Sequence, residues 1–183
     1  MRIVIGMTGA SGFIFGIDLL RRCAAEKYLI LSKWGRYTLK EETGLTEHHL
    51  AEHVKRTFSD EDLAAPFSSG SNSFDALVIL PCSISTMAKI ACGLGDTLLT
   101  RTAQVALKER RKLILCVRET PLSAISLEQA HKLSLAGAIV MPLSPPFYHH
   151  PRSLEDLAEH FSAKVLGLLG QETALAWKPE ALE

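Results

Sequence analysis

The chain has 183 residues, of which 47% are hydrophobic and 22% charged, and its formal net charge at pH 7 is zero. This length suffices for one domain with a substantial core. A zero net charge provides no overall field that favours nucleic acid or an anionic membrane. No segment approaches the ~20 apolar residues of a membrane span. Residues 2–6 read as a first strand with no long apolar run after them, so no signal peptide is expected.

Short apolar runs alternate with longer helical patterns along the chain. Strands are predicted at 3–5, 28–31, 76–80, 113–117 and 138–141, and helices at 12–25, 34–43, 47–57, 84–93, 98–110, 126–136 and 152–169. Ser126 and Ser153 each precede an amide or carboxylate by three residues, which predicts two helix N-caps. Because apolar strands alternate with helices, we expect an α/β fold, a parallel sheet with helices on both faces. A single domain over 1–183 is predicted, with 170–183 as a C-terminal tail.

Four cysteines occur, at Cys23, Cys82, Cys92 and Cys116, and no two form a CxxC pair. Neither a zinc knuckle nor a redox pair is therefore indicated. All four lie in or beside predicted core elements. We expect reduced, buried thiols in a cytoplasmic protein.

The first predicted strand runs into a glycine-rich turn, Gly6-Met-Thr8-Gly9-Ala10-Ser11-Gly12, that opens a helix. Glycines let backbone approach a ligand closely, and a helix N-terminus presents free N–H groups to an anion. The Gly-Lys-Ser/Thr of a Walker A loop is missing. Ser32-Lys33 stands where a dinucleotide site usually has an acid, which favours a phosphorylated mononucleotide. The alternative is a tight turn without a ligand.

Polar residues also follow two later strands. Three hydroxyls lie between Ser83 and Thr86, whereas capping a helix needs only one, which favours a ligand. Arg118 and Glu119 end the apolar run 113–117, where open α/β sheets bind ligands. They suggest an anionic ligand and a moving proton. A surface ion pair in a turn is an equally good interpretation from this segment alone.

Metal sites are not predicted. His49 and His53 have helical spacing, and His149 and His150 share a proline-framed loop, but no carboxylate or third ligand completes either set. The acidic run 59–62 is expected to be solvated or to start a helix. The basic run 108–112 is expected to be a helix C-terminus rather than a nucleic-acid patch.

Together these segments resemble the UbiX-type flavin prenyltransferases, also known in older usage as aromatic-acid decarboxylase subunits. The matching motifs, in chain order, are Met7–Gly12, Leu31–Lys33, Glu42-Thr43, Ser69–Ser71, Pro81–Ser83, Arg101 with Ala106–Arg111, Val117–Pro121 and Phe147–His149. The resemblance implies a Rossmann-like or flavodoxin-like subunit of a dodecamer, with FMN between subunits. It also implies prenyl transfer from dimethylallyl phosphate to N5 and then C6 of reduced FMN. Prenylated FMN would serve a UbiD-type decarboxylase.

The resemblance also implies roles for individual residues. The expected FMN contacts are Gly9, Ala10, Ser11, Ser32, Ser83, Ile84, Ser85, Thr86 and Arg118. The expected contacts to dimethylallyl phosphate are Arg101, Lys108, Tyr148 and Lys164, the last of which is often arginine in the family. The expected catalytic residues are Ser11, Glu42, Glu119 and Trp177, with the two acids near the flavin ring and the indole near the prenyl group.

Two other functions remain open from the sequence. One is an FMN-dependent decarboxylase of the peptidyl- or phosphopantothenoyl-cysteine type, which shares the FMN-binding fold. Its expected catalytic histidine and Asn-Met-rich motif are not visible, although His48, His49 and His53 prevent a flat exclusion. The other is a non-enzymatic FMN carrier.

Overall fold

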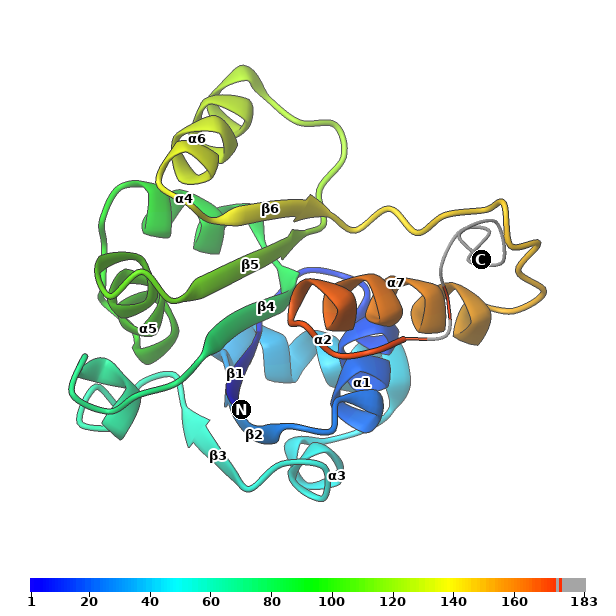
Figure 1. Cartoon of the computed structure of the whole chain (residues 1–183), viewed down its shortest axis with the longest axis horizontal. Coiled ribbons are helices and arrows are strands. Elements are labelled where there is room, and N and C mark those ends of the chain that lie inside the picture. The colour runs from blue at the N-terminus through cyan, green and yellow to red at the C-terminus, as the bar shows by residue number, and fades with distance from the viewer. Residues whose placement is uncertain (174, 176–183) are drawn as a thin grey trace.

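The computed structural model describes residues 1–173 and 175. Its centre is a sheet of six parallel strands in the order β3-β2-β1-β4-β5-β6 (Figure 1). This is the Rossmann order rather than the flavodoxin order. The strands are β1 Arg2–Met7, β2 Glu26–Leu31, β3 Arg56–Ser59, β4 Ala76–Cys82, β5 Lys112–Val117 and β6 Ile139–Pro142.

Helices cover both faces of the sheet, as the alternating pattern predicts (Figure 1). They are α1 Phe13–Arg22, α2 Lys33–Thr43, α3 Glu47–Ala51, α4 Ile84–Ala91, α5 Leu98–Lys108, α6 Ala124–Leu135 and α7 Leu154–Leu168, with a short 3-10 turn at Pro66–Ser68. Helices α1 and α7 share one core cluster with alternate strand residues such as Ile5 and Val78. Helices α4 and α5 share the other cluster with Val4 and Leu77. The α/β fold with helices on both faces is therefore confirmed.

The central strands are apolar throughout because both of their faces are covered. Every residue of β4 is buried, and residues Leu113 to Val117 of β5 are buried as well. A strand packed on two sides needs no alternation of polar and apolar residues. These continuous runs are the reason that the sequence predicts them correctly.

The predicted helix 47–57 is wrong in its second half. Helix α3 ends at Ala51, and Arg56–Ser59 forms the edge strand β3, which pairs with β2. Only Phe58 of this strand is buried, so the sequence has no apolar run here that would predict a strand. Its β-branched and aromatic residues suit a strand better than a helix.

Two further details differ from the sequence prediction. The N-cap of α6 is Ser123, which accepts the Ser126 N–H at 3.1 Å, so Ser126 lies one turn inside the helix. Ser153 caps α7 as expected and accepts the Asp156 N–H at 3.1 Å. Of the four thiols, three are buried, but Cys92 is exposed because it lies just past the end of α4.

Candidate functional site

The sheet reverses its winding direction between β1 and β4. From β1 the chain proceeds through β2 to β3, and from β4 it proceeds the other way to β5 and β6. Loops on either side of such a point diverge and leave a crevice at the carboxyl ends of the strands. Thr8 joins the two loops, since its hydroxyl donates to Pro81 O at 3.0 Å and accepts the Ser83 N–H at 2.7 Å.

A cavity of about 400 Å³, the polar cleft, opens at this switch point. It brings together several of the residues that the sequence predicts as FMN contacts. The residues that line it include Thr8, Gly9, Ser32, Lys33, Trp34, Asp60, Ser83, Ser85, Thr86, Thr97 and Thr100. Its wall therefore carries many hydroxyl groups, which can donate to phosphate or carbonyl oxygens.

The hydroxyls at the start of α4 divide into structural and available groups. Ser83 is the N-cap and accepts the Thr86 N–H at 3.3 Å, while the two hydroxyls contact each other at 3.0 Å. Ser85 is exposed and lines the cleft, and its hydroxyl makes no side-chain hydrogen bond within the described part of the chain. Capping thus uses one hydroxyl, as the sequence suggests, and Ser85 is left for a ligand.

On the opposite wall, Ser32 caps α2 by accepting the Gly35 N–H at 3.0 Å. The glycine turn packs tightly here, because a Cβ at Gly9 would lie 2.5 Å from the Cβ of Trp34. Gly9 therefore permits close approach to α2 of its own chain. At the end of the turn Gly12 has φ +111°, which favours glycine over any other residue.

The Arg118 side chain has a buried donor that no described residue satisfies. Arg118 follows β5, and its N–H donates to Cys82 O at 3.1 Å, next to the loop that carries Ser83. Its Nε is buried and has no hydrogen-bond partner among the described residues. A buried donor of a charged group without an acceptor is costly, so an anionic or carbonyl ligand fits this position.

Glu119 is exposed, and its carboxylate accepts the Thr120 N–H at 3.0 Å. No ion pair joins Glu119 to Arg118 in the described residues, so the surface ion pair that the sequence leaves open is not found. The carboxylate is accessible at the strand end.

Glu42 has a structural role that the sequence does not reveal. Both carboxylate oxygens accept the Gly12 N–H, at 3.0 and 3.1 Å, and one also accepts the Phe13 N–H at 2.9 Å. The free helix N-terminus expected at α1 is therefore occupied by a carboxylate of the same chain, which suits the positive end of the helix dipole. Glu42 and Ser11 line a second cavity of about 520 Å³ between α1, α2 and α7.

The predicted donor residues fall into two groups on opposite faces of the sheet. Arg101 and Lys108 lie two turns apart on α5, whose core residues belong to one cluster. Lys164 belongs to α7, and Tyr148 belongs to the segment before it. Helix α7 packs in the other cluster. The sheet separates α5 from α7 in Figure 1. One chain does not bring the four residues together.

Each group has its own local order. Arg101 Nε donates to Ser68 O at 2.9 Å, and Lys108 forms an ion pair with Glu109 beside Gly70. On the other face, the Tyr148 ring contacts His149, which stacks on His160 of α7. Lys164 is exposed one turn further along the helix. Trp177 lies outside the described residues.

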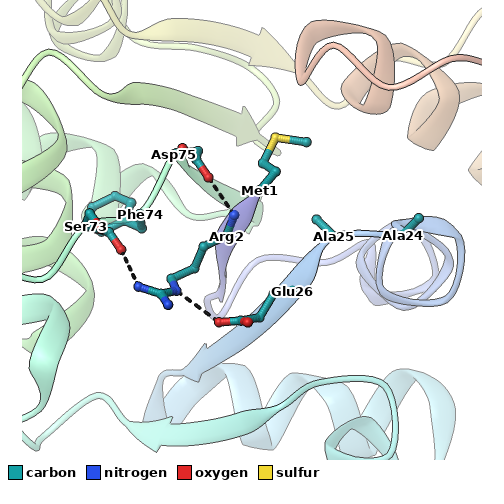
Figure 2. Close-up of a pocket in the computed structure, with 8 residues that line it drawn as sticks. All are labelled: Met1, Arg2, Ala24, Ala25, Glu26, Ser73, Phe74 and Asp75. Carbon is teal, nitrogen blue, oxygen red and sulfur yellow. Dashed lines mark hydrogen bonds and ion pairs between the residues drawn. The ribbon is translucent and has the colours of Figure 1, made fainter.

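Another cavity, of about 460 Å³, lies at the amino ends of the strands, away from the switch point (Figure 2). Its charges are already paired. The Arg2 guanidinium donates to Glu26 at 3.0 Å and to Ser73 O at 2.8 Å, and the Arg2 N–H donates to Asp75 at 2.6 Å. The Tyr28 hydroxyl, Arg2 and Lys55 together lower the pKa of Glu26 to about 2. These hydrogen bonds and ion pairs connect β1 to β2 and to the segment before β4.

The sequence misses Asp60, which it places in a solvated stretch. Asp60 is buried, and its carboxylate accepts the Leu99 N–H at 2.8 Å at the start of α5. Burial raises the pKa of this carboxyl, against the hydrogen bonds from Leu99 and Thr97 that lower it. The partner lies in a distant segment, so no local pattern could reveal the contact.

One of the histidines that the sequence considers as a metal ligand has a structural role. His49 Nδ1 accepts the Thr46 N–H at 3.1 Å as part of a capping box. Within residues 1–173 and 175, no cluster of three or more His, Cys, Asp or Glu side chains could hold a metal. No helix in the same residues is long and apolar enough to span a bilayer.

The Rossmann strand order and the hydroxyl-lined cleft at its switch point define a nucleotide-binding α/β protein. The family model "Flavoprotein" matches residues 1–159. A probable UbiX-like flavin prenyltransferase from Bacillus subtilis is 43% identical, over 93% of this chain and 85% of that protein. Flavin prenyltransferase UbiX from Thermoplasma acidophilum is 42% identical, over 93% and 95%. The chain belongs to the flavoprotein family and, within it, to the UbiX-type flavin prenyltransferases.

Solved structures agree with this assignment. A dodecameric FMN-dependent UbiX-like decarboxylase from Escherichia coli O157:H7 has a TM-score of 0.93 and 39% identity, and the match covers 97% of this chain and 99% of that one. AnUbiX (PadA1), in complex with FMN and dimethylallyl pyrophosphate, has a TM-score of 0.91 and 40% identity, with 97% and 98% coverage. The FMN-dependent cysteine decarboxylase TvaF has a TM-score of 0.64 and 18% identity, which shows the fold alone.

Proposed function

We propose that this chain is a flavin prenyltransferase that transfers a dimethylallyl group from dimethylallyl phosphate to reduced FMN. The observation that carries the proposal is the buried Arg118 Nε, which has no partner among the described residues and whose backbone bonds the loop that carries Ser83 of the polar cleft. The chain is also about 40% identical to flavin prenyltransferases over nearly its whole length. The product, prenylated FMN, is the cofactor of a UbiD-type decarboxylase.

The residues of the cleft fit FMN. The hydroxyls of Ser32, Ser83, Ser85 and Thr86, with the backbone of Gly9, would hold it through hydrogen bonds. The resemblance adds the backbone of Ala10, Ser11 and Ile84, which adjoin these residues in the chain but do not line the cleft. The Arg118 guanidinium would satisfy its buried Nε on an oxygen of the flavin or its phosphate. Reduced FMN supplies the nucleophilic N5 and C6.

The donor residues would stabilise charge on the leaving group. The C–O bond of the allylic phosphate would break as a carbon–nitrogen bond to N5 forms, and phosphate would leave with the electron pair. Ring closure would then add a proton to the remaining double bond and form a carbon–carbon bond to C6, with loss of the C6 proton. Cations preorganised around that phosphate lower the barrier, so we assign this role to Lys108, Lys164, Arg101 and the Tyr148 hydroxyl. We assign the uptake of the released protons to Glu119, which is exposed at the strand end, and to the departing phosphate.

We assign Glu42 a double role. Its carboxylate fixes the Gly12 turn and the start of α1, and it lines a cavity with Ser11, so it orients the segment that adjoins the flavin. We keep Trp177 as the aromatic group near the prenyl chain on the resemblance alone.

We propose a homododecamer, since the four donor residues lie on opposite faces of one sheet and need a second subunit to meet. The fully buried thiols of Cys82 and Cys116 fit a reducing compartment, which supports the cytoplasm as the location.

The test is an anaerobic incubation with reduced FMN and either dimethylallyl phosphate or the diphosphate, followed by mass spectrometry of the flavin. A gain of one isoprenyl unit supports the transferase and identifies the donor. Unchanged FMN with tight binding would instead support a carrier. Loss of carbon dioxide from a cysteine-terminated peptide, with no prenyl transfer, would support the decarboxylase alternative.

A further inference from the structure

The segment between β6 and α7 is held to the protein by few backbone contacts. Its last backbone bond to the sheet is from the Leu143 N–H to Val117 O, at 2.8 Å. Over residues 145–151 the described backbone–backbone hydrogen bonds number one, from His150 N–H to Phe147 O at 3.1 Å, and it lies within the segment. Three of these seven residues are prolines, which have no N–H to donate. Side chains must therefore fix the tip.

A stack of three rings provides that attachment. The His149 ring lies on the His160 ring of α7 with centroids 3.9 Å apart and planes at 11°. The Tyr148 ring also contacts His149, with centroids 4.2 Å apart and planes at 47°. His149 therefore lies between Tyr148 and His160 in the sequence of ring contacts. Both histidines are mostly buried, whereas Tyr148 is more exposed, at 50%. Tyr148 is thus connected to α7 through His149 and His160.

The position of the stack on α7 relates it to the donor phosphate. His160 and Lys164 are four residues apart on one helix, so they share a face. The stack therefore places Tyr148 over the face of α7 that carries Lys164. We propose that His160 is a positioning residue: through its stack on His149 it holds the Tyr148 hydroxyl in the donor-phosphate site. This inference rests on the proposed function and adds to it a residue that contacts neither substrate.

The charge state of the stack agrees with this role. Desolvation and the neighbouring His160 and His150 lower the pKa of His149. A lowered pKa favours the neutral imidazole of His149, which can stack on a neighbouring ring without charge repulsion. A carbon ring of similar shape at position 160 should stack equally well.

The experiment compares His160→Ala with His160→Phe, and uses His131→Ala, an exposed histidine of α6, as the matched control. Aromatic contacts of this kind are worth roughly two- to tenfold in an equilibrium constant. We expect His160→Ala to raise KM for dimethylallyl phosphate by about that factor, with the Kd of FMN unchanged. His160→Phe and His131→Ala should resemble the parent enzyme.

Hydrogen exchange of residues 143–152 gives a second readout that does not depend on activity. At the hydrogen-bonded amides of Leu143 and His150, exchange should accelerate in His160→Ala and remain slow in His160→Phe. If the parent enzyme shows no prenyl transfer, the proposed function fails, while exchange still decides whether the stack holds the segment. Faster exchange with an unchanged KM would refute the positioning role, as would a His160→Phe variant as impaired as His160→Ala. Unchanged exchange in His160→Ala would refute the stack as the attachment.

Discussion

The polar cleft and the donor residues are built in different ways. The cleft is assembled within one chain, where loops after β1, β2, β3 and β4 meet at the switch point and Thr8 bonds two of them together. The donor residues are divided between α5 on one face of the sheet and the α7 region on the other. A single subunit can therefore offer the hydroxyl-lined part of a flavin site that the resemblance puts between subunits, whereas the predicted contacts to the allylic phosphate come together only when subunits associate. Flavin binding and prenyl transfer should respond separately to mutation.

The largest effect should come from Lys108→Ala and Tyr148→Phe. A hydrogen bond to a charged group contributes about 1.5–3 kcal/mol, so each variant should lose roughly ten- to hundredfold in prenyl transfer. Flavin binding, measured by fluorescence titration, should change little because both residues lie away from the cleft. Lys132→Ala, on the exposed part of α6, is the control. A variant that binds FMN poorly but converts the bound complex normally would show that its role is misassigned.

Arg118→Met should weaken flavin binding while the donor residues stay intact. The Nε is buried without a partner, so removing the charge should leave the melting temperature of the flavin-free protein unchanged or higher. The affinity for FMN should fall about tenfold or more, since a charge-assisted hydrogen bond is lost. Calorimetry of the flavin-free protein and a binding titration check the two halves. A destabilised flavin-free protein with normal affinity would assign Arg118 to the fold.

The two candidate acids should differ in their effects on stability. Glu42→Ala removes the acceptor for two N–H groups at the start of α1, so the free energy of unfolding should fall by about 0.5–2 kcal/mol. Glu119→Gln should change it by less than about 1 kcal/mol, since this side chain is exposed and unpaired by any described cation. The Glu119→Gln variant should instead turn over more slowly than the parent enzyme. The opposite pattern in urea unfolding would exchange the two roles.

The smallest effect should come from metal removal. The positive charge available to the leaving phosphate is carried by side chains, namely Arg101, Lys108, Arg118 and Lys164, which suits a monophosphate. Turnover with dimethylallyl phosphate and pre-reduced FMN should be the same with and without excess EDTA. Loss of activity that Mg²⁺ restores would overturn the metal-free mechanism and the phosphate-site assignment together.

The sequence predicts what local patterns encode. Runs such as 113–117 predict buried strands because both faces of the sheet are covered, and Ser153 predicts a helix start because its cap partner is three residues away. The sequence misses β3, an edge strand with one buried residue. It also misses the cap that Glu42 provides thirty residues from Gly12, and the burial of Asp60 against α5. Those contacts depend on tertiary structure, which no short motif records.

The division of the donor site between subunits is tested most directly by complementation. Lys108→Ala and Lys164→Ala subunits, each nearly inactive alone, would be co-produced in equal amounts and purified as mixed oligomers. If Lys108 and Lys164 reach one site from different subunits, about a quarter of the sites regain both residues by random mixing, and activity should recover to about that fraction. A mixture of Lys108→Ala with the double variant is the control and should stay inactive. Mixed oligomers no more active than either variant alone would show that Lys108 and Lys164 do not reach one site from different subunits.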